Sequence, residues 1–156
     1  MGKDRRFVLC RDRRGMFWDL LLYVPTVLAL ATTAALFWYR DESSLAYLLS
    51  FLASFFAIVG ANRVLRTRLL LLPGAAVAIE VAGEVARIER RDGGRLDLMK
   101  QIRIFRDLSG KSFGLTGLDG QGSKQQLVFH QGQFETLEQF SELLSLLDRI
   151  AVKPKT

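Results

Sequence analysis

The chain has 156 residues, of which 49% are hydrophobic and 24% are charged, and its formal net charge is +6. This hydrophobicity excludes a disordered or collagen-like chain. A single cysteine excludes a disulfide framework and a cysteine-rich metal site.

The positive charge is concentrated in two parts of the sequence. Residues 1–15 contain six basic and two acidic side chains, and three arginines follow at positions 63, 66 and 68. From Leu69 onward there are 12 basic and 11 acidic side chains, which nearly cancel. Since phosphate binding requires a basic surface, we expect no nucleic-acid partner.

Two apolar segments follow the basic N-terminal residues. The first, Met16 to Tyr39, contains one charge, Asp19, and the second, Leu45 to Ala61, contains none. Roughly 20 residues of helix cross a bilayer, so we predict two transmembrane helices at about 16–39 and 45–65. The first run is longer than the apolar core of a cleaved signal peptide. Residues 1–15 are then a basic cytoplasmic N-terminus, and 16–68 form a hairpin.

The basic residues on either side of this hairpin predict its orientation. Arg13 and Arg14 precede the first span, Arg66 and Arg68 follow the second, and the connecting turn 40–44 has a net charge of −1. The positive-inside rule therefore places both termini in the cytoplasm. The same four arginines are also positioned to contact anionic lipid headgroups.

Small residues recur every four positions in both spans. They are candidates for a helix-packing interface, within the hairpin or with the helix of a partner, because small side chains let backbones approach in lipid. The alternative is that alanine is simply common in membrane helices. The positions are Ala31, Ala35, Ala53, Ala57 and Ala61.

Asp19 is the one ionisable residue inside a span. With the turn centred between positions 41 and 42, antiparallel helices place position 19 opposite position 64, next to Arg63. We predict that Asp19 and Arg63 form a structural intramembrane pair. The alternative is that each faces interfacial water independently.

Residues 69–156 have the pattern of a small antiparallel-sheet domain. Residues 75–91 fit either strands or a helical face, with strands favoured. Turn signals at 92–94, 109–111 and 119–123 separate short alternating segments. Thr136 and Gln139 form a capping box before an amphipathic helix that extends to Ile150. The chain is therefore expected to be an α+β membrane protein with a C-terminal amphipathic helix.

Four segments carry a resemblance to a known family. They are Gln101-Ile102-Arg103-Ile104, Ser112-Phe113-Gly114-Leu115, Gln126-Leu127-Val128-Phe129, and Phe134 leading into the helix from Leu137 to Leu144. This layout resembles the bacterial pleckstrin-homology-like membrane proteins, particularly the YcxB-like group. The resemblance implies a PH-like fold for residues 69–156 and a location in the inner membrane of a bacterium.

Catalytic motifs are not completed by the residues present. Gly110-Lys111-Ser112 has the end of a P-loop, but Phe105 stands where the earlier glycine is needed. His130 is the only histidine and has no second histidine or cysteine with which to share a metal. We expect no catalytic residues, no metal and no cofactor, and therefore not an enzyme.

The leading hypothesis is a noncatalytic, membrane-anchored interaction module. It would act as an accessory subunit or assembly factor and bind an integral membrane protein. The alternative is a sensor of anionic lipid headgroups, and a membrane-bound enzyme is a third hypothesis.

Overall fold

The structure is a computed structural model, and it describes residues 4–152. The chain divides into two compact units: residues 12–69 form one, and the chain on either side of them forms the other. Lys3, which contributed to the N-terminal charge, lies outside the described residues, as do both chain ends.

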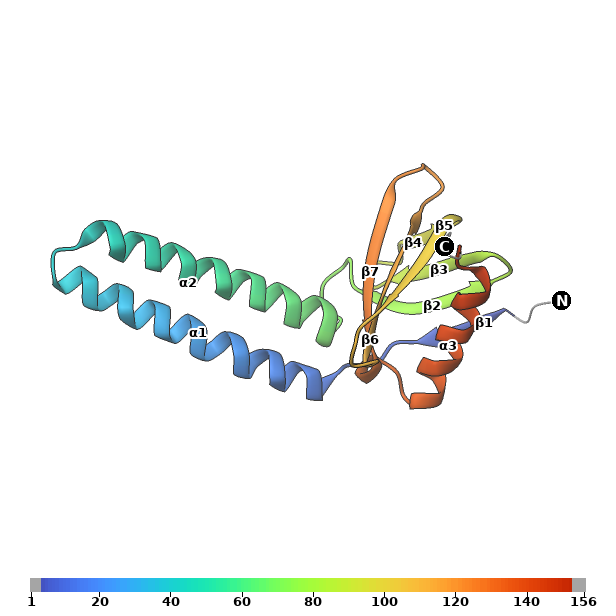
Figure 1. Cartoon of the computed structure of the whole chain (residues 1–156), viewed down its shortest axis with the longest axis horizontal. Helices are drawn as coiled ribbons and strands as arrows, with labels where there is room; N and C mark the ends of the chain where they lie inside the picture. Colours follow the sequence, from blue (N-terminus) through green and yellow to red (C-terminus); the bar gives the residue numbers. More distant parts are fainter. Residues whose placement is uncertain (1–3, 153–156) are drawn as a thin grey trace. The chain divides into compact units, whose positions relative to one another are not determined.

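The first unit is a hairpin of two long helices (Figure 1). Helix α1 spans Arg13–Tyr39 and helix α2 spans Ser43–Arg63, and α2 continues into a π-helical segment, η1, at Val64–Arg68. Both helices are long and apolar enough to cross a membrane. They agree with the predicted spans at 16–39 and 45–65.

The contact between the two helices does not follow the predicted four-residue spacing. The buried small residues are Ala34 on α1 and Ala46, Ala53 and Gly60 on α2. Residues seven apart lie almost on the same side of a helix, whereas each step of four residues rotates the position by about 40° around the helix axis. Only a seven-residue spacing therefore maintains a long line of contact, which we call the helix seam. Of the predicted interface, Ala53 is buried in this seam. Ala31, Ala35, Ala57 and Ala61 are exposed and take no part in it.

The second unit contains two antiparallel sheets. Strands β1 (Arg5–Val8), β2 (Ala76–Ala82), β3 (Val85–Arg90) and β4 (Arg95–Leu98) form one in that order, and β5 (Lys100–Arg106), β6 (Ser112–Leu118) and β7 (Lys124–His130) form the other. A short 3-10 helix, η2 (Gln131–Gln133), and helix α3 (Leu137–Ile150) follow. Residues 75–91, which the sequence left open, thus contain strands.

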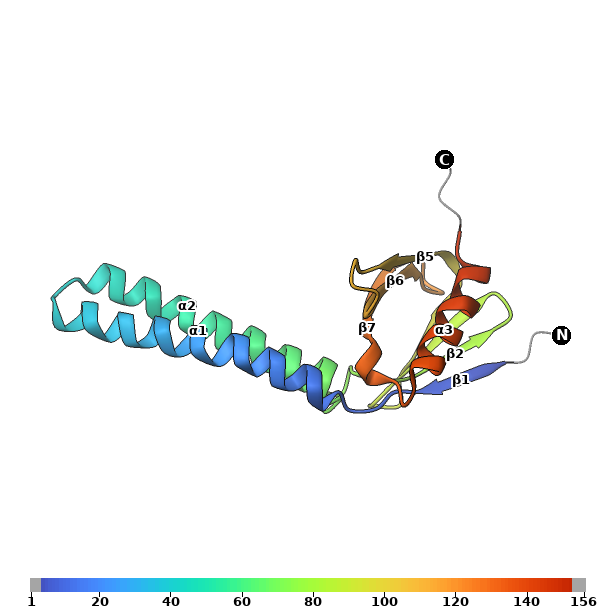
Figure 2. The same cartoon turned by 60° about the horizontal axis from the view of Figure 1, so that its bottom comes forward.

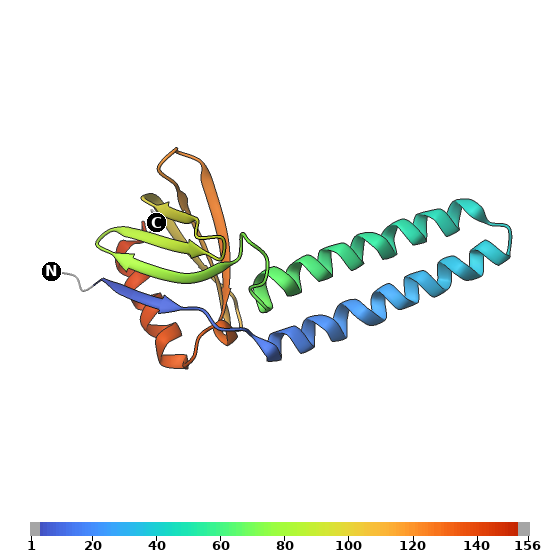
Figure 3. The ribbon, with the colours of Figure 1, turned by 180° about the vertical axis from the view of Figure 1, so that it is seen from behind.

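Strand β1 corrects the predicted domain boundary. Residues 1–15 were expected to be a separate basic segment, but Arg5–Val8 pair with β2 in the register Arg5↔Val81 to Val8↔Ala78 (Figure 3). Strand β1 places the apolar Phe7, 4% exposed, in the core. The hairpin is therefore inserted between two neighbouring strands of one sheet, and a domain beginning at residue 69 lacks an edge strand.

Helix α3 closes the space between the two sheets (Figure 2). Thr136 caps its first turn by accepting a hydrogen bond from the Gln139 N–H at 3.2 Å, which is one half of the predicted capping box. Its apolar face buries Phe140, Leu143 and Leu147 against Phe113 of β6, whose ring lies 5.6 Å from that of Phe140. The core of the unit thus joins both sheets and the helix.

Candidate functional site

Four charged residues meet at the end of the hairpin where the chain enters and leaves it. They are Asp12, Asp19, Arg63 and Arg68, and we call them the hairpin-base cluster. Their formal charges sum to zero. All four belong to the hairpin unit.

Arg68 is the centre of this cluster. Its Nη1 donates to Asp12 Oδ2 at 2.6 Å, and its Nε donates to Asp19 Oδ2 at 2.7 Å. Arg63 Nε donates to the same Asp19 oxygen at 3.3 Å. The structure therefore brings Asp19 and Arg63 together, and it adds Arg68 as the shorter partner of Asp19.

Burial differs sharply between the two arginines. The side chains of Arg68, Asp12 and Asp19 are at most 10% exposed, whereas that of Arg63 is 45% exposed. Buried charges require partners and hydrogen bonds, and these are supplied within the cluster. Arg68 was expected among the basic residues at the membrane surface. In the structure its guanidinium is held between two carboxylates.

Backbone contacts fix the same residues. Asp12 caps α1 by accepting the Gly15 N–H at 2.8 Å, and the Asp12 N–H donates to the Arg68 carbonyl at 2.9 Å. Gly15 leaves the necessary room: a Cβ there would lie 2.2 Å from Asp12 Oδ2 and 2.4 Å from Arg68 Nη1. The cluster thus ties the first residues of α1 to the last residues of η1.

Sequence reasoning missed Asp12 and Arg68 as partners. The hairpin arithmetic that paired Asp19 with Arg63 also places position 68 opposite position 15, between the two carboxylates. That signal was present, but the second helix was expected to end near residue 65. The other predicted basic residues, Arg13, Arg14 and Arg66, are exposed.

Several charged side chains of the sheet unit form ion pairs with one another. Arg6 on β1 bonds Glu89 on β3 at 2.6 Å, and this hydrogen bond holds the pKa of Glu89 below its ordinary value. Arg5 pairs with Glu142 of α3 at 2.9 Å. Two arginines of the basic N-terminal segment therefore form ion pairs within the sheet unit.

Metal-binding groups do not converge in the part of the chain that is described. Within residues 4–152 no three histidine, cysteine, aspartate or glutamate side chains lie together as metal ligands would. Cys10 is exposed. Comparisons of the chain with models of protein families, with curated proteins and with solved structures gave no match.

Proposed function

We propose that this protein is a noncatalytic, membrane-anchored interaction module of the bacterial inner membrane. In this proposal the hairpin spans the membrane with both termini in the cytoplasm, and the sheet unit is a PH-like domain that binds protein. The protein would serve an inner-membrane complex as an accessory subunit or assembly factor.

The observation that carries this proposal is the apolar surface of the hairpin. Large side chains on both helices are strongly exposed, among them Leu22 at 64%, Phe51 at 66% and Ile58 at 70%. Such a surface is unfavourable in water and costs nothing in hydrocarbon. Trp18 and Trp38 stand near opposite ends of α1, where amphipathic rings favour the two membrane interfaces.

The sheet unit supports an interaction role. Four-stranded and three-stranded antiparallel sheets closed by one C-terminal helix agree with the fold that the family resemblance implies. The buried charges of the hairpin-base cluster neutralise one another, which favours a structural use for them over a catalytic one. Burial of Arg68 also weakens the alternative of headgroup sensing by Arg66 and Arg68 together.

Alkaline extraction followed by native purification tests the proposal. The tagged chain is expected to stay in membranes washed with carbonate and to co-purify in mild detergent with a stoichiometric integral membrane protein. Release by carbonate would contradict the anchor. Purification of the chain alone, together with binding to anionic but not neutral lipid nanodiscs, would replace the interaction module by the headgroup sensor.

A further inference from the structure

The outer face of the β5-β6-β7 sheet contains a shallow depression of about 150 Å³. It lies within the sheet unit and is lined by polar and basic side chains together with apolar ones. The principal lining residues are Gln101, Arg103, Phe105, Thr116, Leu118 and Lys124.

A β-bulge in β5 gathers the basic residues on this face. Lys100 pairs with Leu118 and Arg103 pairs with Thr116, so three steps along β5 match two along β6. Residues three apart in a regular strand point to opposite faces, but the extra residue puts Lys100 and Arg103 on the same one. Gln101, with φ of 53°, takes up the distortion.

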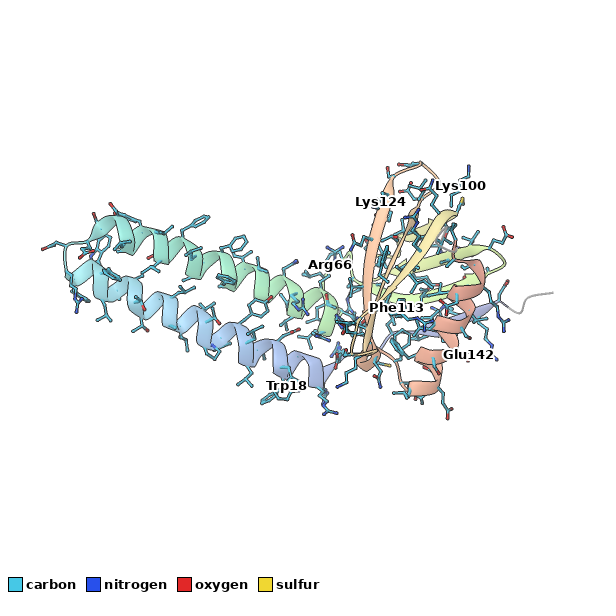
Figure 4. The ribbon with its side chains drawn as sticks, in the orientation of Figure 1. Trp18, Arg66, Lys100, Phe113, Lys124 and Glu142 are labelled. Atoms are coloured by element: carbon cyan, nitrogen blue, oxygen red, sulfur yellow. The ribbon has the colours of Figure 1, made fainter. Side chains whose placement is uncertain are left out.

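Lys124 of β7 pairs with Leu118, so the row Lys100–Leu118–Lys124 carries a cation at each end. Figure 4 shows Lys100 and Lys124 at the same end of the sheet. Among residues 4–152 neither lysine forms an ion pair, and nor does Arg103. The depression is therefore locally cationic.

The acidic residue nearest in sequence to Lys124 is committed elsewhere. Asp119 accepts hydrogen bonds from the Gln121 and Ser123 N–H groups at 2.9 and 2.8 Å and from Gln125 Nε2 at 3.0 Å. These bonds use both carboxylate oxygens to close the β6–β7 turn.

Thr116 adds a hydroxyl that the protein itself does not use. The residue is 6% exposed, and its side chain makes no hydrogen bond to any residue in the described range. No buried side-chain oxygen or nitrogen among residues 4–152 lacks a partner, so the Thr116 hydroxyl itself reaches solvent. Since Thr116 lines the depression, its hydroxyl is available to a ligand there, beside Arg103.

An apolar row lies next to the cationic end on the same face. Phe105 pairs with Gly114, which pairs with Val128, and the two apolar side chains are 57% and 48% exposed. Gly114, which has no side chain, leaves the surface low between them. The face as a whole therefore suits a ligand that is anionic at one end and apolar a few ångströms further along.

We propose that this face binds an acidic segment of a partner protein. A carboxylate of the segment lies in the depression, where Arg103 and the Thr116 hydroxyl donate to it and Lys100 and Lys124 attract it. An adjacent apolar side chain rests on Phe105 and Val128. This inference rests on the proposed interaction role and names the chemistry of the partner.

The observations favour a protein segment over a lipid headgroup. The depression is smaller than the roughly 300 Å³ and above that is usual for pockets that bind whole small molecules, and it suits a single acidic side chain. Phe105 and Val128 lie within strands on a sheet face, whereas side chains that reach hydrocarbon have to protrude from it. The terminal residues of the chain itself contain Lys3, Lys153 and Lys155, so their charge is of the wrong sign.

Binding to two defined peptides tests the proposal. The full chain in neutral detergent is titrated against a dye-labelled peptide of four glutamates followed by leucine and phenylalanine, and against the same peptide with glutamines. We expect the acidic peptide to bind at least about tenfold more tightly, and Arg103→Gln to remove about that factor. Thr116→Val should weaken binding severalfold, while Thr116→Ser, which keeps the hydroxyl, should restore it.

Lys111→Gln provides the matched control, because it removes one exposed cation at the β5–β6 turn outside the depression. It should leave binding within about twofold of the wild type, because screened charges at a distance contribute little. Equal binding by the wild type, Arg103→Gln and Thr116→Val would overturn the site. Arg103-dependent binding to anionic nanodiscs without peptide binding would also overturn it and would assign the face to lipid. Arg103-dependent dimerisation would likewise overturn it and would assign the face to a second copy of the chain. Failure of the membrane anchor would alter carbonate extraction and leave this detergent assay unchanged.

Discussion

Asp12 and Arg68 are bound to each other twice, once through the backbone and once through their side chains. The Asp12 N–H donates to the Arg68 carbonyl at 2.9 Å, and Arg68 Nη1 donates to Asp12 Oδ2 at 2.6 Å. Because these residues stand at the two ends of the hairpin unit, the paired contacts close the insertion between β1 and β2.

Replacing Arg68 should therefore destabilise the hairpin more than replacing Arg63. Arg68→Met leaves two buried carboxylates without their main cation, and breaking a buried pair in this way costs about 3–5 kcal/mol. Arg63→Met should cost about 1 kcal/mol or less, because its side chain is 45% exposed. The free energy of unfolding of the full chain in detergent measures both. Equal losses, or a larger loss for Arg63→Met, would contradict the central position of Arg68.

Gly15→Ala should disturb the same contact by steric means. The added Cβ would lie within 2.4 Å of both Asp12 Oδ2 and Arg68 Nη1, so the ion pair has to separate. The loss should be about 1–3 kcal/mol and should shrink in an Arg68→Met background, because the two changes remove one interaction. Gly120→Ala is the control, since its Cβ would meet nothing closer than 4.0 Å. Additive losses would show that Gly15 acts independently of Arg68.

Gly60 and Ala57 on α2 differ in whether they lie in the helix seam between α1 and α2. A Cβ at Gly60 would lie 2.7 Å from Tyr23 Cγ, whereas Ala57 is exposed. Gly60→Val should lower the free energy of unfolding by about 1–3 kcal/mol, and Ala57→Val should leave it within about 0.5 kcal/mol of the wild type. The opposite ranking would return the interface to the four-residue stripe predicted from sequence.

Much of this fold follows from sequence because its signals are local. Uncharged runs define α1 and α2, glycine-containing turns separate the strands, and Thr136 marks the start of α3. Strand β1 could not be predicted in this way: four residues rich in arginine resemble a basic flank until Phe7 meets the core and Arg5 and Arg6 meet distant glutamates. The burial of Thr116 could not be predicted either, because it depends on the neighbouring strands.

Acid should destabilise the β6–β7 turn. Hydrogen bonds from the Ser123 N–H, the Gln125 side chain and the Gln121 N–H hold the pKa of Asp119 below its ordinary value. A lowered native pKa contributes stability that is present above about pH 3.9, the unfolded value, and is lost as the pH falls through the native one. Asp119→Asn should therefore reduce the fall in thermal midpoint between pH 6 and pH 3. Ser123→Ala keeps the backbone donor and should preserve the wild-type fall, and an unchanged fall in Asp119→Asn would contradict the assignment.

Partner binding should depend on the exposed alanines, although the packing of α1 against α2 does not use them. Ala57→Leu adds bulk on the exposed side of α2, where the close approach of a partner helix would require a small residue. We expect the variant to stay in carbonate-washed membranes and to lose most of the co-purifying membrane protein. Full retention of the partner would remove Ala57 from the interface.

Site-directed labelling tests the membrane-spanning hairpin most directly, because Cys10 is the only cysteine and is exposed. A membrane-impermeant maleimide is applied to spheroplasts and to inverted membrane vesicles carrying either the wild type or the double variant Cys10→Ser, Glu42→Cys. The account predicts that the wild type reacts only in inverted vesicles and that the double variant reacts only in spheroplasts, since the turn and the sheet unit then face opposite sides of the membrane. Reaction of both proteins from the same side would contradict it.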